Sequence, residues 1–193
     1  PPGGLYMSVI LRPDIPLGRL PTITLAAGIA CSLALEKLCG LEVKLKWPND
    51  LLFKGEKIGG ILCELFDAGK RPGVIIGIGV NVNSTGFPGE LEGAASLRII
   101  TGRIHDTGEL LNDVLGTLTA LLKDFHPPLE KALLREWEAA SSSIGARVFY
   151  RRPDGMRSGI IAGLDPRGFL MIRDDVDAKT VPYSGEVLFE DDR

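Results

Sequence analysis

The sequence is poor in the residues that most often bind metals or act as nucleophiles, with three cysteines and two histidines among 193 residues. Cys31, Cys39 and Cys63 lie in apolar segments without metal-ligand spacing, so we expect buried thiols in a reducing cytoplasm. His105 and His126 adjoin loop signals without a partner pattern, which favours surface positions. No Ser-His-Asp arrangement can be placed, and no G-x-G-x-x-G lies between a strand and a helix.

The sequence also lacks a basic excess, a long apolar run and a visible signal peptide. Its formal net charge of -3 argues against general nucleic-acid binding. No apolar run approaches the about 18–20 residues of a membrane span, so we expect a cytoplasmic protein without membrane contact. The sequence begins Pro-Pro-Gly-Gly without a methionine, and we expect its first residues to be processed, trimmed or absent. Its 45 % of hydrophobic residues suffice for a real core.

Hydrophobic periodicity predicts a succession of strands and helices up to residue 140. Pro21 is a helix start and Gly40 a helix stop, and residues 106–109 (Asp-Thr-Gly-Glu) resemble a capping box before an apolar stripe. Trp137 is expected in the core, and residues 84–102 are expected to be loop with one helical turn. The predicted strands are 5–11, 43–47, 51–53, 57–66 and 74–82, and the predicted helices are 21–38, about 106–125 and 129–140.

The pattern of the sequence changes after residues 141–143 (Ser-Ser-Ser), from long helical repeats to short β-rich runs. Turn signals at 153–155 and 165–168 separate short β-rich runs, which together predict a small barrel. We place a domain boundary there, with one domain at 1–143 and a second at 144–193. The predicted strands of the second domain are 146–150, 156–164, 168–173, 178–182 and 186–189.

Residues 46–50 (Lys-Trp-Pro-Asn-Asp) and 57–62 (Lys-Ile-Gly-Gly-Ile-Leu) gather charges, amides and glycines between apolar flanks. Charges on a rigid apolar scaffold are typical of a binding site. The competing interpretation is that the lysines are solvated and that the aspartate only serves a turn. The strand at 74–82 adds two glycines on one face beside the two amides Asn81 and Asn83, which looks like space for a ligand. Two lysines and a carboxylate suited to Mg²⁺ would offset charge when a carboxylate reacts with a nucleotide phosphate.

Four segments in order resemble the motifs of bacterial biotin protein ligases. Residues 46–50 read K-W-P-N-D, residues 57–64 read K-I-G-G-I-L-C-E, and residues 77–81 read G-I-G-V-N. Residues 4–8 (G-L-Y-M-S) match a further segment of that family. The resemblance covers essentially the whole chain. It implies an α+β fold, with a mixed β-sheet packed by helices followed by a small SH3-like β-barrel.

The resemblance also implies a reaction and a biotin site. Biotin and ATP give biotinyl-5′-AMP and pyrophosphate, and a lysine of a biotin carboxyl carrier protein domain then attacks the mixed anhydride. Lys57 falls on the catalytic lysine, which contacts the biotin carbonyl and the phosphate. Gly60, Gly77 and Gly79 fall on backbone positions that line the biotin pocket, and Tyr6 falls near its wall.

The nucleotide site follows from the same resemblance. Lys46, Asn49, Asp50 and Asn81 fall on ATP and adenylate contacts, and Asp50 falls on a contact to Mg²⁺. Members of this family are often dimers, so a homodimer is possible.

The family also carries a basic glycine-rich loop, G-R-G-R-x-G-R, and biotin-gripping residues upstream of the first matching segment. The sequence starts after them, so we expect an amino-terminally incomplete catalytic core. One alternative is an inactive homologue or a split-ligase module that binds ligand without catalysis. A lipoate or octanoate transferase is disfavoured by the K-W-P-N-D motif and by the appended β-domain.

Overall fold

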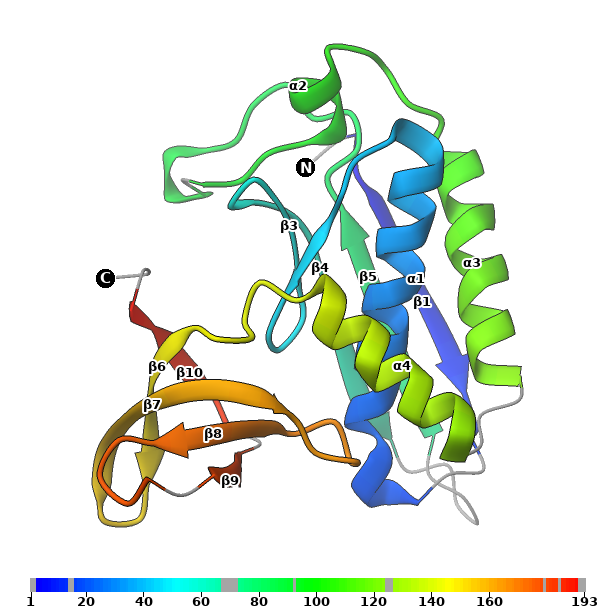
Figure 1. The fold of residues 1–193 in the computed structure, drawn as a ribbon. Coiled ribbons are helices and arrows are strands. Elements are labelled where there is room, and N and C mark those ends of the chain that lie inside the picture. The colour runs from blue at the N-terminus through cyan, green and yellow to red at the C-terminus, as the bar shows by residue number, and fades with distance from the viewer. Residues whose placement is uncertain are drawn as a thin grey trace.

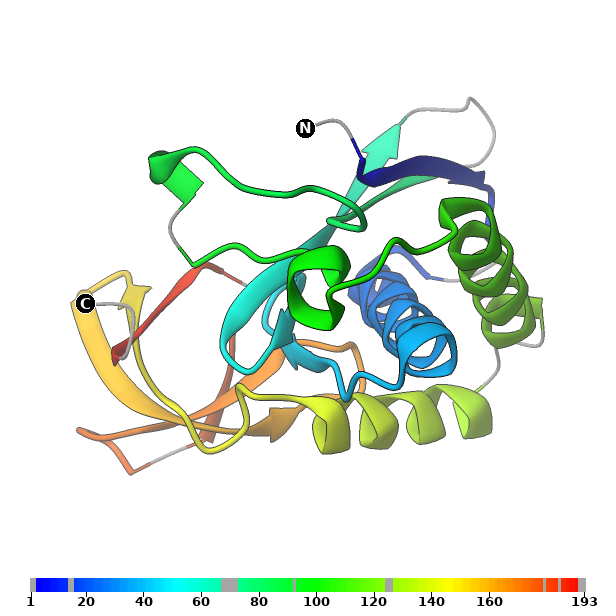
Figure 2. The ribbon, with the colours of Figure 1, turned by 90° about the horizontal axis from the view of Figure 1, so that it is seen from above.

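The computed structural model of the chain describes residues 3–13, 16–66, 73–91, 93–123, 127–178, 180–183 and 185–190. Two five-stranded sheets are present, and three longer helices pack against the first of them (Figure 1). Seen from above, the three helices lie on one side of that sheet (Figure 2). The α+β class expected from the sequence is confirmed.

The first sheet has the strand order β1-β5-β4-β3-β2, and each pair of neighbouring strands is antiparallel. The expectation of a mixed sheet is therefore wrong. A two-residue turn joins β3 to β4, and Lys54 and Gly55 adopt the positive φ angles of 50° and 88° that a twisted hairpin requires. The strands are β1 (Leu5–Leu11), β2 (Lys44–Lys46), β3 (Asp50–Phe53), β4 (Glu56–Phe66) and β5 (Gly73–Val80).

Helix α1 (Pro21–Cys39) forms the centre of the hydrophobic core. Proline in its first turn and Gly40 at its end, with φ of 69° and an N–H bonded to the Glu36 carbonyl, fix its limits as predicted. It contacts α3 (Thr107–Lys123), α4 (Pro127–Ala140) and the sheet, so it is apolar all round. By length and composition α1 could cross a membrane, so the expectation of no such run is wrong. Most of α1 is buried inside the fold, and a helix in a hydrophobic core has the same apolar composition.

The connections around these helices hold short helical turns. A 3-10 helix, η1 (Leu17–Arg19), precedes α1, and another, η2 (Gly89–Leu91), and the short α2 (Leu97–Thr101) lie between β5 and α3. The predicted cap of α3 is confirmed, because the Asp106 carboxylate accepts the N–H of Gly108 at 2.7 Å and of Glu109 at 3.2 Å.

His105 is buried, so its predicted surface position is wrong. Its Nε2 lies 2.6 Å from the Thr101 hydroxyl. The Asn83 side chain forms two hydrogen bonds with the backbone of His105. Its Nδ2 donates to the His105 carbonyl, and its Oδ1 accepts from the His105 N–H, each at 2.9 Å. Burial lowers the pKa of His105. Its sequence neighbourhood has loop character, and the burial arises from contacts with distant residues. His126 lies outside the described residues.

The cysteines differ in burial. Cys31 in α1 is fully buried as predicted, and desolvation raises the pKa of its thiol to about 12. Cys39 and Cys63 are only partly buried, so the expectation of three buried thiols holds for one of them. Cys63 lies in β4 where that strand extends beyond β3, which leaves it less covered than a central position.

The second sheet has the order β10-β6-β7-β8-β9, with antiparallel neighbours throughout. Strands were predicted in all five places. In the described part of the chain β9 and β10 lie at opposite ends of the order and do not pair, so the sheet is open where a barrel was expected. The strands are β6 (Arg147–Arg152), β7 (Gly155–Leu164), β8 (Leu170–Asp174), β9 (Thr180–Tyr183) and β10 (Val187–Phe189).

Hydrogen bonds join the residue after β2 to the segment that leads into the second sheet, and join the second sheet to the helical layer. The N–H of Trp47 donates to the Ser143 hydroxyl at 2.8 Å, and the N–H of Leu164 donates to the Glu138 carboxylate at 2.7 Å. Trp137 in α4 is buried as predicted and packs edge-on against Trp47, with ring centroids 6.3 Å apart. The predicted domain boundary at Ser143 falls in this junction and stays a prediction.

Tyr150 and Asp174 form a buried polar pair in the second sheet. The Tyr150 hydroxyl donates to one carboxylate oxygen, and the N–H groups of Val176 and Asp177 donate to the other at 2.8 and 3.1 Å. The tyrosine hydrogen bond, followed by these backbone donors, lowers the pKa of Asp174 to about 2. Burial, reinforced by the carboxylate, raises the pKa of Tyr150 to about 12.

We expect Tyr150→Phe to weaken the dependence of stability on acid pH. Because folding lowers the pKa of Asp174 from 3.8 to about 2, its contribution to the free energy of unfolding is present above pH 3.8 and is lost as the pH falls through about 2. Without the hydroxyl the pKa of Asp174 returns toward its ordinary value, so acidification should remove less of the free energy of unfolding. Urea unfolding at about pH 5 and about pH 2.5 measures the difference. Tyr183→Phe, which removes a hydroxyl bonded to the Glu186 carbonyl, should keep the wild-type acid slope. Equal slopes for wild type and Tyr150→Phe would contradict the assignment.

Candidate active site

One row of residues crosses the five strands of the first sheet. The register pairs Lys46 with Asp50 and Asp50 with Gly60. It then pairs Gly60 with Gly79 and Gly79 with Tyr6. Directly opposed residues of antiparallel strands point to the same face. The helices cover one face of the sheet (Figure 2), and a Cβ atom at Gly28 of α1 would contact Leu45 and Ile61, the strand neighbours of Lys46 and Gly60. Because neighbouring residues of a strand point to opposite faces, the row lies on the open face.

A β-bulge brings Lys57 to the same face. The pairing of β3 with β4 shifts beside Leu52, and the consecutive residues Ile58 and Gly59 are both buried. Lys57 therefore turns outward, as bulges commonly do for a functional side chain. Its Nζ lies 2.5 Å from Asp50 Oδ1. The sequence predicted that these two residues belong to one site, and the structure brings them into contact.

The ion pair between Lys57 and Asp50 is partly open to water, with side-chain exposures of 52 % and 24 %. Exposed pairs of this kind contribute little to stability, because water screens the attraction. A charged ligand can therefore replace either partner at small cost. The pair thus places one positive and one negative charge side by side at the cavity.

A shallow cavity of about 570 Å³ lies over this part of the sheet. Its floor is built from glycines. A Cβ atom added at Gly60 would come no closer than 3.6 Å to the Asn49 carbonyl, and one added at Gly77 no closer than 3.6 Å to the Leu62 carbonyl. The space above these glycines is thus open, and a ligand can reach the backbone. Seven of the nine predicted site residues line the cavity: Tyr6, Asn49, Asp50, Lys57, Gly60, Gly77 and Gly79.

Sequence reasoning missed Ser8 and Leu62, which also line the cavity. Both lie directly opposite Gly77 in the strand register, one on each side. Strand alternation from Tyr6 would have identified Ser8. Leu62 carried no comparable signal, because it reads as an apolar flank of the charged segment.

Asn49 and Asn81 both use their side-chain amides within the protein. The amide of Asn49 donates to the Ile61 carbonyl at 2.6 Å, and the N–H of Ile61 returns a bond to the Asn49 carbonyl at 2.9 Å. Asn49 nevertheless lines the cavity. Asn81 does not line it, and its amide donates to the Ala95 carbonyl at 3.1 Å.

The loop held by Asn81 supports the backbone of Lys57. The N–H of Lys57 donates to the Gly93 carbonyl at 2.8 Å, and the Lys57 carbonyl accepts the N–H of Ala95 at 2.9 Å. Lys57 is thereby paired to β3 on one side and to this loop on the other. The second predicted residue outside the cavity lining is Lys46, whose Nζ lies 4.5 Å from the ring centroid of Phe189.

No group of three or more His, Cys, Asp or Glu side chains in the described part of the chain could hold a metal ion by itself. Mg²⁺ commonly binds through one or two carboxylates, with water and substrate phosphates as its other ligands. The single carboxylate of Asp50 at the cavity rim fits that mode. A magnesium contact at Asp50 thus stays a prediction.

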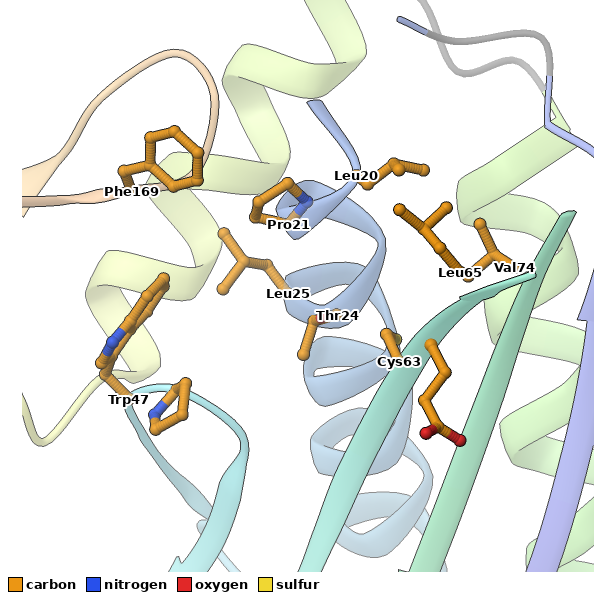
Figure 3. A pocket seen from close by; sticks show the side chains of 11 residues that line it. Leu20, Pro21, Thr24, Leu25, Trp47, Cys63, Leu65, Val74 and Phe169 are labelled. Atoms are coloured by element: carbon orange, nitrogen blue, oxygen red, sulfur yellow. The ribbon is translucent and has the colours of Figure 1, made fainter. Parts of the chain in front are cut away.

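A second cavity, of about 410 Å³, lies apart from the lysine–aspartate pair. It is bordered by Leu25 of α1, by Trp47, by Cys63 of β4 and by Phe169 in the loop between β7 and β8 (Figure 3). None of the nine predicted site residues lines it. Its walls are mainly apolar, and it lacks a paired cation and carboxylate of the kind found on the open face.

The sheet, the lysine–aspartate pair and the glycine floor all lie in the part of the chain that matches one class of proteins, the biotin and lipoate protein ligases. Residues 1–81 match the model of the Biotin/lipoate A/B protein ligase family. The Biotin--[acetyl-CoA-carboxylase] ligase of Paracoccus denitrificans is 31 % identical over 98 % of this chain and 81 % of its own length. The chain belongs to the biotin protein ligase family.

Two further comparisons bear on how much of a ligase the chain represents. The Bifunctional ligase/repressor BirA of Bacillus spizizenii is 35 % identical over 95 % of this chain, which spans 58 % of that protein. The structure of biotin protein ligase from Aquifex aeolicus in complex with biotin and ATP has a TM-score of 0.81 at 32 % identity, covering 97 % of this chain and 78 % of that one. The likeness thus includes both sheets of the chain.

Proposed function

We propose that this chain carries out the chemistry of a biotin protein ligase. A biotin carboxylate oxygen attacks the α-phosphorus of ATP, the bond to the β-phosphate oxygen breaks, and pyrophosphate leaves. The amine of a lysine on a biotin carboxyl carrier protein domain then attacks the biotin carbonyl, loses a proton and releases AMP. The observation that carries the proposal is the contact of Lys57 with Asp50 over the glycine floor, at the positions of the family motifs.

Lys57 is proposed as the catalytic residue. Its ammonium exchanges the Asp50 carboxylate for the biotin carboxylate and the α-phosphate, and so offsets the repulsion between two anions. The bulge and the loop at Gly93 hold its backbone before substrate arrives. A charge that is already in place stabilises the transition state without reorganisation.

The remaining roles divide between the two substrates. Gly60, Gly77 and Gly79 are proposed to let the biotin rings lie against the backbone, with Tyr6 as a wall. The Tyr6 ring is 57 % exposed, so it has room to cover a ligand.

On the nucleotide side, Asn49, Asn81 and Lys46 are proposed to contact ATP. Asn81 would have to release the Ala95 carbonyl to do so. When bound at Asp50, Mg²⁺ would neutralise phosphate charge.

Biotin-dependent exchange of labelled pyrophosphate into ATP tests the first step with the full-length protein. We expect exchange with biotin and none with lipoate or octanoate. Transfer is then measured on a carrier domain, with a lysine-to-arginine carrier as control. Exchange that depends on lipoate would overturn the substrate assignment. Biotin binding in calorimetry without exchange would favour the alternative of a binding or split-ligase module.

Three finer expectations accompany the proposal. The second sheet is proposed to be an SH3-like module. The protein is proposed to act in the cytoplasm, and two copies of it are proposed to associate. Light scattering over a range of concentrations, with and without biotin and ATP, tests the association. A constant monomer mass would contradict it.

A further inference from the structure

Lys46 is the predicted site residue whose surroundings were least expected. It is the last residue of β2, an edge strand of the first sheet, and its ammonium lies over an aromatic ring from the second sheet. The distance from Lys46 Nζ to the Phe189 ring centroid is 4.5 Å, well within the range of a cation–π interaction. The contact therefore links the lysine of the K-W-P-N-D motif to the last strand of the chain.

The ring is held in place by its own sheet. Phe189 is 8 % exposed and lies opposite Val148, which is fully buried. Leu188, the preceding residue on β10, points the other way and is 51 % exposed. A buried aromatic side chain on a paired strand has little rotamer freedom, so its face is a fixed surface for the ammonium.

The position of the second sheet relative to β2 is fixed by other contacts. The N–H of Trp47, the residue after Lys46, is bonded to the Ser143 hydroxyl at 2.8 Å. The N–H of Ser142 donates to the Leu45 carbonyl at 3.0 Å. Backbone groups on both sides of Lys46 are thus tied to the junction that leads into the second sheet, and the ring meets the ammonium in a defined geometry.

This geometry matters because of what lies beside Lys46. Its backbone is in register with Asp50, and Asp50 contacts Lys57. A lysine side chain has four rotatable bonds, and contact with a fixed ring narrows the positions that its ammonium samples. The ring thus helps to keep a second positive charge beside the site, outside the lining of the cavity.

We propose that Phe189 is a positioning residue for Lys46, through which the second sheet sets the place of the nucleotide's phosphates. The inference rests on the proposed function and adds to it a named contact between the two sheets. Biotin binds on the glycine floor away from this edge, so Phe189 acts on the nucleotide and leaves biotin binding unchanged.

A double-mutant cycle tests the coupling in the full-length protein. Phe189→Leu should raise the KM for ATP about 2- to 5-fold, the size expected for a partly exposed cation–π contact. The KM for biotin should stay constant. In a Lys46→Met background the same change should have no further effect on the KM for ATP. An equal effect in both backgrounds would overturn the inference.

Two variants separate positioning from general damage. Phe189→Tyr keeps the ring face and should restore the wild-type KM for ATP. Leu188→Ala removes an apolar side chain from the same strand on the opposite face and should change neither KM. A Phe189→Tyr protein as impaired as Phe189→Leu would speak against a role for the ring.

A readout without catalysis distinguishes failure of this inference from failure of the proposed function. An amine-reactive label, followed by peptide mass spectrometry, measures the accessibility of Lys46 relative to Lys44, which is paired with Glu42. Labelling of Lys46 should rise about 2- to 5-fold in Phe189→Leu and stay at the wild-type level in Leu188→Ala. If the wild type shows no exchange activity but labelling changes as expected, the contact stands and the proposed function fails. Unchanged labelling in Phe189→Leu sinks the inference whatever the activity.

Discussion

Replacing Lys57 with alanine is expected to lower the rate of adenylate formation by at least ~10²-fold, the loss typical of a preorganised group that stabilises transition-state charge. The physical reason lies in the contact of Lys57 with Asp50. The variant leaves the carboxylate at the rim of the cavity without its cation. The negative charges of biotin and of the α-phosphate then meet a third one. Single-turnover formation of the biotinyl adenylate measures the effect.

Lys44→Ala is the matched control for Lys57→Ala. It removes the same charge from the same sheet, but Lys44 is paired with exposed Glu42 and does not line the cavity. Water screens an exposed pair of this kind, so both folding and adenylate formation should stay near wild type. Near-normal turnover in Lys57→Ala, or an equal loss in Lys44→Ala, would show that general charge and not the position of Lys57 matters.

Local signals in the sequence predicted most of the elements of the fold. The limits of α1 follow from Pro21 and Gly40, and the β3–β4 turn follows from a glycine between two strand patterns. Each of these signals acts within a few residues, so no tertiary information is needed to interpret it. The direction of pairing has no such local signal, and the sheet proved antiparallel where a mixed one was expected.

The site was predictable as a set of residues but not as an arrangement. Most of its members stand in segments whose composition is unusual for a surface, which is why the sequence identified them. The bulge at Ile58 and Gly59, which turns Lys57 toward Asp50, is invisible in the sequence, because strict alternation would place Lys57 on the other face. The contact of Lys46 with Phe189 joins residues 143 positions apart, and no local pattern encodes it.

The adjacent glycines Gly59 and Gly60 should respond to substitution in opposite ways, because they face opposite sides of the sheet. A Cβ atom at Gly59 would lie 2.5 Å from the Gly79 carbonyl oxygen, a backbone atom that cannot move aside alone. Gly59→Ala should therefore lower the free energy of unfolding by about 1–3 kcal/mol or more, as overpacking does. Urea unfolding measures this change.

Gly60→Val should instead leave the fold nearly intact and reduce biotin binding. The nearest atoms to a Cβ at Gly60 are 3.6 Å away and belong to the cavity wall, so the new side chain occupies the space over the glycine floor. Its methyl groups stand where the biotin ring is proposed to lie. A steric clash that costs about 1.4 kcal/mol or more of binding free energy weakens biotin binding at least about 10-fold. Calorimetry with biotin measures the affinity, and unfolding in urea serves as the check on the fold. Undiminished biotin affinity in a folded Gly60→Val protein would move the biotin site off the glycine floor. A stable Gly59→Ala protein would contradict the strand register on which the row from Lys46 to Tyr6 depends.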